Sequence, residues 1–105
     1  MRKEGSLSDL SRFGEPAILV LLALNSGPQH GYALMTTIEQ ELGFKLGPGT
    51  LYGAIAKLLK LGMIRRLASV DRAKPYEITD SGRAAVAEFV RAWTPVLKLG
   101  QGVVS

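Results

Sequence analysis

Residues 47–66 read GPGTLYGAIAKLLKLGMIRR, and this stretch decides the fold. It predicts a helix that begins at Pro48, because proline is tolerated in a first helical turn, and ends at Gly62. At about 100° per residue, one side of this helix collects the large aliphatic residues Leu51, Ile55, Leu58 and Leu59. The opposite side collects small and basic residues, namely Thr50, Gly53, Ala56, Lys57 and Lys60, with Tyr52 at the boundary. We expect the apolar side to pack in the core and the small, basic side to stay open.

Two helices are expected before this stretch. The first begins near Glu15 and contains residues 17–24 (AILVLLAL), which are apolar on every side. Such a helix should be covered on more than one face, so we expect one face to meet the core and another to meet a partner. The chain breaks at residues 25–28, and a second helix is expected over residues 31–42, with Gly43 as its left-handed cap.

Two short strands and a last helix are expected after it. The strand candidates are residues 64–68 and 76–79, which would form a hairpin, or wing. The last helix is expected to begin near Asp80, with Thr79 or Asp80 as its cap. Pro95 is expected to kink or break this helix. The order of elements predicts a mainly α fold with a small β wing, in which a winged helix-turn-helix domain is followed by a C-terminal helix.

The charge of the chain is concentrated in one segment. The 105 residues carry a net charge of +4, but residues 45–74 alone hold seven basic residues against one acid, and the rest of the chain is net negative. A basic segment on a mildly acidic remainder favours a face that binds a polyanion. An ordinary solvated face is the alternative.

Several classes of function lack the residues that they need. The sequence contains no cysteine, which excludes disulfides, cysteine zinc sites and thiol nucleophiles. The single histidine, His30, has no cluster of acids at ligand spacing, and no glycine-rich phosphate loop is present. We therefore expect no enzyme activity, no cofactor and no metal. The longest apolar run, residues 17–24, is far too short to span a bilayer, so we expect a cytoplasmic protein with no membrane partner.

Four motifs carry a family resemblance. They are residues 30–32 (HGY), 47–52 (GPGTLY), 57–64 (KLLKLGMI) and 76–83 (YEITDSGR). In this order and spacing they closely resemble the PadR family of transcriptional regulators, over about residues 15–92. The resemblance implies a homodimeric winged-helix repressor that binds a pseudo-palindromic promoter operator in double-stranded DNA and is released by an effector. Gly53 departs from the family pattern, which commonly has proline after the tyrosine.

The resemblance also divides the chain by role. It implies a DNA-binding domain over residues 15–79 and a C-terminal dimerisation helix over residues 80–99. The composition of the two ends predicts a flexible N-terminal arm over residues 1–14 and a tail over residues 100–105. The helix over residues 48–61 would enter the major groove of DNA. The first and last helices would form the dimer.

The expected DNA-binding residues combine this resemblance with their chemistry. They are Thr50, Tyr52, Gly53, Lys57, Lys60, His30, Tyr32, Arg72 and Lys74. Small residues let the backbone approach DNA, hydroxyl groups donate to phosphates or base edges, and lysines neutralise phosphates. Arg72 and Lys74 would reach the adjacent backbone or minor groove from the wing. His30 has three open roles, which are a helix cap, a phosphate contact or a plain surface turn.

A second group of residues is expected at the dimer interface or at a ligand site. They are Trp93, Phe89, Val86, Val90, Leu97 and Leu21. Trp93 is either a core residue of the interface or, as the family resemblance implies, one of two symmetry-related side chains that stack a planar hydrophobic or phenolic effector. Two other functions remain open: a winged-helix module that binds an acidic protein, and a ligand-sensing dimer without a primary DNA role.

Overall fold

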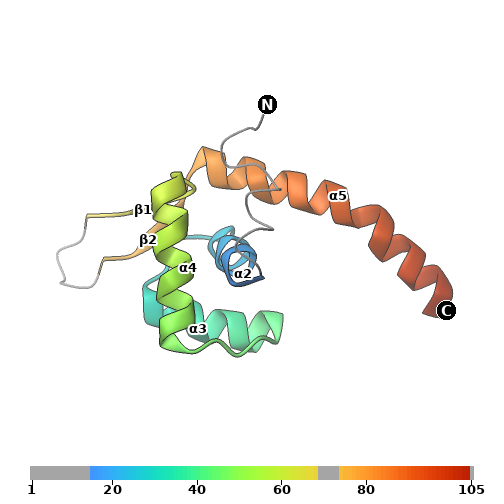
Figure 1. The fold of residues 1–105 in the computed structure, drawn as a ribbon, viewed down its shortest axis with the longest axis horizontal. Helices are drawn as coiled ribbons and strands as arrows, with labels where there is room; N and C mark the ends of the chain where they lie inside the picture. Colours follow the sequence, from blue (N-terminus) through green and yellow to red (C-terminus); the bar gives the residue numbers. More distant parts are fainter. Residues whose placement is uncertain (1–14, 69–73, 105) are drawn as a thin grey trace.

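The computed structural model describes residues 15–68 and 74–104. In chain order, its elements are helices α2 (Glu15–Leu24) and α3 (Gly31–Thr37), the π-helix η1 (Ile38–Leu42), helix α4 (Pro48–Leu61), strands β1 (Ile64–Arg66) and β2 (Tyr76–Ile78), and helix α5 (Asp80–Val104). Helices α2, α3 and α4 form the body, the hairpin projects from one side, and α5 leaves the other side as an arm (Figure 1). This is the winged helix-turn-helix fold that the sequence predicts.

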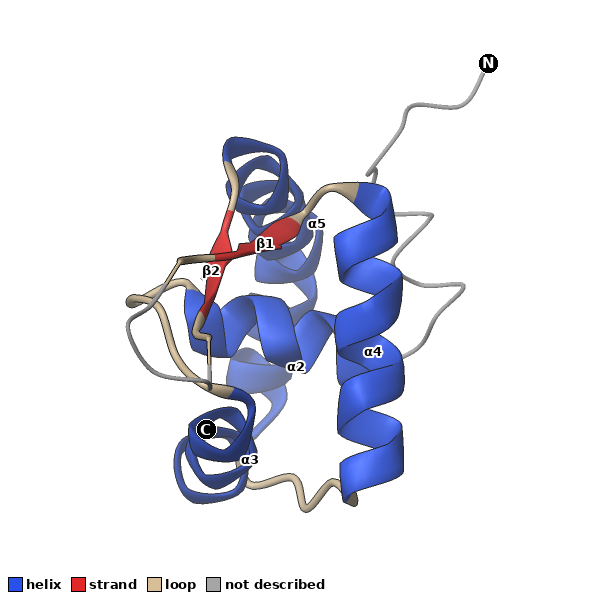
Figure 2. Ribbon diagram, turned by 90° about the vertical axis from the view of Figure 1, so that its left-hand side faces the viewer, coloured by secondary structure: helices blue, strands red, loops and turns tan. Residues whose placement is uncertain are grey.

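Helix α2 lies at the centre of the molecule. It contacts α3, η1, α4, β2 and α5, and both views show it enclosed by these elements (Figures 1 and 2). Its all-round apolar sequence is therefore covered mainly by its own chain, whereas the sequence predicted that a partner would cover one face. Leu21, which was expected at an interface, is only 1% exposed and belongs to this core.

The helix expected over residues 31–42 is present, but its second part differs from an α-helix. Residues 38–42 widen into the π-helix η1. Gly43 then adopts a left-handed conformation (φ +80°), and its amide donates to the carbonyl oxygen of Glu39 at 3.2 Å. The predicted left-handed cap at Gly43 is confirmed, because this backbone conformation is one that glycine adopts without a steric penalty.

Helix α4 buries the side that the periodicity assigned to the core. Leu51, Ile55 and Leu58 are buried and Leu59 is partly buried, as predicted. Gly62 ends the helix in a left-handed conformation (φ +76°). The chain then enters the wing through two buried residues, Met63 and Ile64.

The wing is a short antiparallel hairpin. Ile64 pairs with Ile78, Arg65 with Glu77, and Arg66 with Tyr76. Both strands are shorter than the predicted ranges of residues 64–68 and 76–79. Residues 69–73 lie outside the described residues, and the predicted DNA contact Arg72 is among them.

Helix α5 begins at the predicted cap and ends later than predicted. The Thr79 hydroxyl accepts a hydrogen bond from the Gly82 amide (3.2 Å) and donates one to the Gly62 carbonyl oxygen (2.7 Å), so it joins the start of α5 to the end of α4. The helix is not broken at Pro95. It continues to Val104, through part of the segment that was predicted to be a tail. Proline removes one backbone donor, and this structure accommodates that loss within an otherwise continuous helix.

Candidate nucleic-acid interface

The exposed side of α4 carries the small and basic residues that the periodicity placed there. Thr50, Gly53, Lys57 and Lys60 are all exposed, and Ala56 lies among them. A Cβ atom added at Gly53 would meet no atom within 4 Å, so the backbone is open to solvent at this point. These residues form an exposed ridge along α4, with its positive charge in the C-terminal half.

Tyr52 connects this ridge to the start of α3. Its ring lies directly against Gly31, where an added Cβ atom would be 2.8 Å from the Cζ atom of Tyr52 and closer still to the hydroxyl oxygen. Gly31 is buried, while Tyr52 remains 47% exposed at the predicted boundary of α4. The contact thus joins two of the four sequence motifs, through residues that lie 21 positions apart.

The two neighbours of Gly31 point outward. His30 occupies the position before the first turn of α3, but its side chain makes no capping hydrogen bond, so the capping role considered from the sequence is wrong. His30 is exposed, and Tyr32 is 75% exposed. Both are therefore available on the surface beside the N-terminal half of α4, as a phosphate contact would require.

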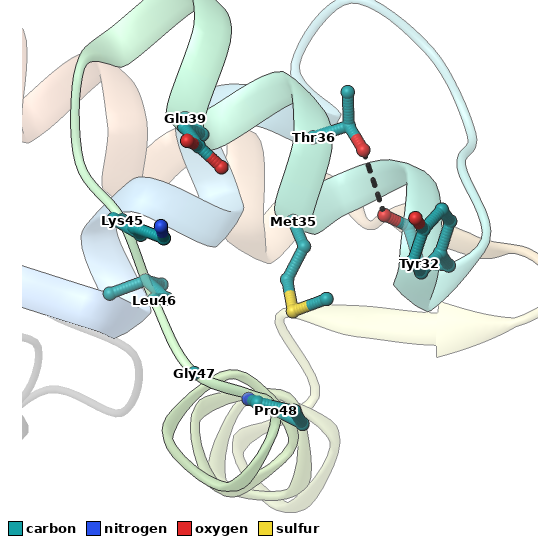
Figure 3. A pocket seen from close by; sticks show the side chains of 8 residues that line it. All are labelled: Tyr32, Met35, Thr36, Glu39, Lys45, Leu46, Gly47 and Pro48. Atoms are coloured by element: carbon teal, nitrogen blue, oxygen red, sulfur yellow. Dashed lines mark hydrogen bonds between the residues drawn. The ribbon is translucent and has the colours of Figure 1, made fainter.

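A shallow pocket of about 320 Å³ opens between α3–η1 and the segment that leads into α4 (Figure 3). Its lining residues are Tyr32, Met35, Thr36, Glu39, Lys45, Leu46, Gly47 and Pro48. Lys45 was counted in the basic segment but was not predicted as a site residue. Lys45 lies in the segment that leads into α4, at the opposite end of the pocket from Tyr32 (Figure 3). Glu39 lines the same pocket, so the charge there is mixed.

The two arginines of β1 have different surroundings. The Arg65 guanidinium donates to Oε1 of Glu77 across the hairpin, at 2.9 Å from Nε and 2.8 Å from Nη2. The guanidinium of Arg66 lies 5.8 Å from the centre of the Tyr76 ring. Successive residues of a strand point to opposite faces, so these contacts fall on different sides of the wing. Lys74, in the described part of the wing loop, is exposed.

An apolar groove of about 340 Å³ lies on another part of the molecule, between α2, η1 and α5. It is lined by Ile18, Leu19, Leu22, Leu42, Phe44, Phe89 and Trp93. The rings of Phe89 and Trp93 lie 5.9 Å apart, tilted by 39°. The sequence singled out these two aromatic residues, but it did not include Phe44 or the three residues of α2.

The other residues expected at this interface divide into two groups. Val86 is buried in the core with Leu21, so neither can contribute directly to a surface. Val90 and Leu97 are exposed, as an interface requires. The sequence signal for the α2 side of the groove was the all-round apolarity of residues 17–24. A helix that is apolar on every side has apolar side chains beyond those that pack in the core, and these can line a groove.

Two further properties concern the described residues alone. No group of three or more potential ligands among His, Cys, Asp and Glu lies close enough to hold a metal ion. No helix in residues 15–68 and 74–104 is both long enough and apolar enough to cross a membrane.

The fold is a helix-turn-helix followed by a two-stranded wing, and the last helix of the motif has an exposed basic face. This architecture is that of winged-helix DNA-binding proteins. Residues 18–88 match the PadR-like family of transcriptional regulators, and this chain belongs to that family. The family and the fold are those of transcriptional regulators.

Solved structures agree with this assignment. The fold is similar to that of a PadR family transcription regulator from a hypervirulent Clostridium difficile, with a TM-score of 0.76 and 21% identity over 88% of this chain and 100% of that one. It is also similar to Bacillus subtilis PadR in complex with operator DNA, with a TM-score of 0.64 and 24% identity over 70% of this chain and 46% of that one. At these identities the likeness shows the fold.

A curated relative is nearer in sequence. It is an uncharacterised 37.1 kDa protein in transposon TN4556 of Streptomyces fradiae, 46% identical over 72 residues. The match covers 69% of this chain and 21% of the relative, so the chain spans about a fifth of the length of that protein.

Proposed function

We propose that this protein is a sequence-specific DNA-binding regulator, which acts as a homodimeric repressor at a pseudo-palindromic promoter operator and is released by an effector. The observation that carries the proposal is the open face of α4, which is small in its first half and basic in its second. The complex of Bacillus subtilis PadR with operator DNA supports it, since that protein shares the fold. The cytoplasmic location and the absence of enzyme activity expected from the sequence remain part of this proposal.

In the proposed complex, α4 lies in the major groove. Gly53 and Ala56 have almost no side chain, so the helix backbone can come close to the base edges. Thr50 and Tyr52, near the N-terminus, donate to phosphates or bases, and the free amides of the first turn favour a phosphate. Lys57 and Lys60 neutralise phosphates along the groove.

The wing and the start of α3 supply the flanking contacts. Lys74, with Arg72 in the undescribed part of the loop, would reach the neighbouring backbone or minor groove. His30 and Tyr32 would contact phosphate from the other side of α4. Arg65 is a weaker candidate than these residues, because its guanidinium is already paired with Glu77.

Dimerisation is proposed through α5. The later part of this helix extends from the body as an arm (Figure 1), and the exposed apolar residues of the helix include Val90, Trp93, Val96 and Leu97. A single chain would leave this apolar strip in water, which folded monomers rarely do over a continuous surface. A second copy that packs along it would bury the strip and would set two α4 helices about 34 Å apart, one turn of DNA.

An effector site is proposed in the apolar groove beside Trp93. The groove is almost entirely apolar, and two of its lining residues, Phe89 and Trp93, belong to the same α5 that would form the dimer. A planar hydrophobic or phenolic molecule that stacks on Trp93 would alter the packing of α5, and so would favour a dimer with mismatched α4 spacing. The same groove also favours the second candidate function, a ligand-sensing dimer.

The proposal is tested by fluorescence anisotropy with duplex DNA from upstream of the gene for this protein, over a series of salt concentrations. We expect binding that exceeds binding to scrambled DNA by about 10³ or more and that falls steeply with salt. The double variant Lys57→Ala/Lys60→Ala should bind more weakly and with a smaller salt slope. Arg83→Ala/Lys98→Ala is the charge-matched control, since it also removes two positive charges but takes them from exposed residues of α5.

Equal, weak binding to all sequences would overturn the proposal and would leave a basic surface for an acidic protein partner. Saturable dye binding at Trp93 without promoter binding would favour the ligand-sensing dimer.

A further inference from the structure

Gln29 makes four hydrogen bonds to three separate parts of the fold. Its backbone exchanges two with Tyr76, with the Gln29 amide donating at 3.1 Å and its carbonyl accepting at 2.8 Å. Its side-chain Nε2 donates to the carbonyl oxygen of Ala23 at 2.9 Å, and its Oε1 accepts from the Thr37 hydroxyl at 2.7 Å. The residue is partly buried, so these bonds are shielded in part from competition with water.

Each partner belongs to a different element. Ala23 lies in the last turn of α2, Thr37 is the last residue of α3, and Tyr76 is the first residue of β2. Gln29 itself lies in the connection between α2 and α3 and adds a third, one-residue strand to the wing. The side-chain amide therefore connects the two helices that support α4 to the segment that pairs with the wing.

The bonds from Gln29 add to the contacts that already hold the wing. Its base is held by the buried side chains of Ile64 and Ile78, and Tyr76, in the last pair of the ladder, is buried as well. Beyond that pair the Leu67 amide donates to the Pro75 carbonyl oxygen at 2.9 Å. A two-stranded hairpin of this length is marginal by itself. The bonds from Gln29 fall on Tyr76, so they hold the hairpin at the point where the loop that carries Lys74 begins.

We propose that Gln29 is a positioning residue whose side-chain amide holds the outer end of the wing in register with α4, so that Lys74 and α4 meet the same DNA duplex. The DNA part of this inference rests on the proposed function. Gln29 itself need not contact DNA. It acts by holding Tyr76, and through it the charge at Lys74, at a constant position relative to α4.

The first test measures the free protein. In Gln29→Leu the backbone can still pair with Tyr76, but both side-chain bonds are lost. We expect amide hydrogen exchange to become faster at Tyr76 and at Leu67, whose amide bonds the Pro75 carbonyl oxygen at 2.9 Å, while the amides inside α4 keep their protection. Gln40→Leu is the matched control, because Gln40 is an exposed glutamine of η1. Unchanged exchange at Tyr76 and Leu67 would overturn the inference without any reference to DNA.

The second test is a double-mutant cycle read as the slope of log affinity against log salt. Each lost phosphate contact lowers the magnitude of this slope by about 0.9, so Lys74→Ala should lower it by about 1.8 in the otherwise unaltered homodimer, which loses one contact in each subunit. In the Gln29→Leu background the same substitution should change the slope much less, because the wing loop no longer meets DNA at a constant position. A role in general stability alone would lower the fraction of folded protein and leave the effect of Lys74→Ala intact.

Two further variants cover the case in which Gln29→Leu does not fold. Thr37→Val removes one bond with little change in shape, and Gln29→Glu keeps the acceptor for Thr37 but loses the donor to Ala23. Both should show the same coupling to Lys74→Ala. Full additivity in folded, DNA-binding variants would overturn the positioning role. If the unaltered protein itself shows no salt-dependent DNA binding, the proposed function is overturned. The exchange test would in that case still decide whether Gln29 holds the wing.

Discussion

Tyr52 lies against the α-carbon of Gly31 so closely that residue 31 has no room for a side chain. This contact joins the beginning of α3 to the first turns of α4, and so it determines how the two helices of the helix-turn-helix motif sit together. Tyr52 is also the side chain at the boundary of the proposed DNA-reading face. Tyr52 therefore both packs against the start of α3 and borders the proposed DNA-reading face.

Substitution of Gly31 by alanine should weaken DNA binding more than it weakens the fold. The added methyl group collides with the outer end of a half-exposed side chain, which can swing away, so we expect a loss of about 1 kcal/mol in the free energy of unfolding. The displaced tyrosine should lower affinity for operator DNA. Chemical denaturation and anisotropy measure the two effects. Combining Gly31→Ala with Tyr52→Ala should restore the lost stability in part, and strict additivity would contradict the contact.

Gly82→Ala should be more destabilising than Gly31→Ala. At this position an added Cβ atom would overlap the carbonyl oxygen of Met63, which is backbone and cannot move aside as a side chain can. Gly82 also donates its amide to the Thr79 cap of α5. We expect a loss of about 2–3 kcal/mol in denaturant unfolding. A loss smaller than that of Gly31→Ala would show that the start of α5 can shift relative to the wing.

Gly53→Ala should raise stability and lower DNA affinity at the same time. The position is an exposed helix interior with nothing within 4 Å of the added carbon, so alanine should stabilise α4 by about 0.5–1 kcal/mol. In the proposed complex the same methyl group enters the space between the helix and the base edges. Thermal unfolding and operator titration measure these opposite changes. Unchanged affinity in the more stable variant would argue against close approach at Gly53.

Leu97→Asp should weaken the proposed dimer. Leu97 is 62% exposed on the arm of α5, and a carboxylate there would have to be desolvated when a second copy packs against it. We expect the dimer dissociation constant to rise by at least about tenfold, measured by sedimentation equilibrium. The control is Ala92→Asp, an exposed residue on a different side of the same helix. Equal effects of the two substitutions would contradict an interface along the apolar strip.

Trp93 should report on the occupancy of the apolar groove. It is the only tryptophan of the chain and it lines the groove beside Phe89, so a planar dye that stacks there should quench its fluorescence in a saturable way. Phe44→Ala enlarges the groove from the opposite wall and should change the affinity for the dye without removing the reporter. Linear, non-saturable quenching would count against an effector site at this place.

Much of this architecture follows from local patterns in the sequence. The two faces of α4, the left-handed cap at Gly43 and the cap of α5 at Thr79 were all predictable, because helical periodicity and capping depend on residues within a few positions of each other. The exposed face of Thr50, Gly53, Lys57 and Lys60 belongs to this group, and it is the part of the candidate site on which the proposed function depends.

Other features were decided only when distant segments came together. The burial of Leu21, the pairing of Arg65 with Glu77, the place of Phe44 in the groove and the four bonds of Gln29 each depend on elements that are remote in sequence. No periodicity encodes such contacts, since each is set by how α2, α5 and the wing pack around one another. The sequence by itself thus determined which face of α4 is exposed, whereas the tertiary structure decided what holds that face in place.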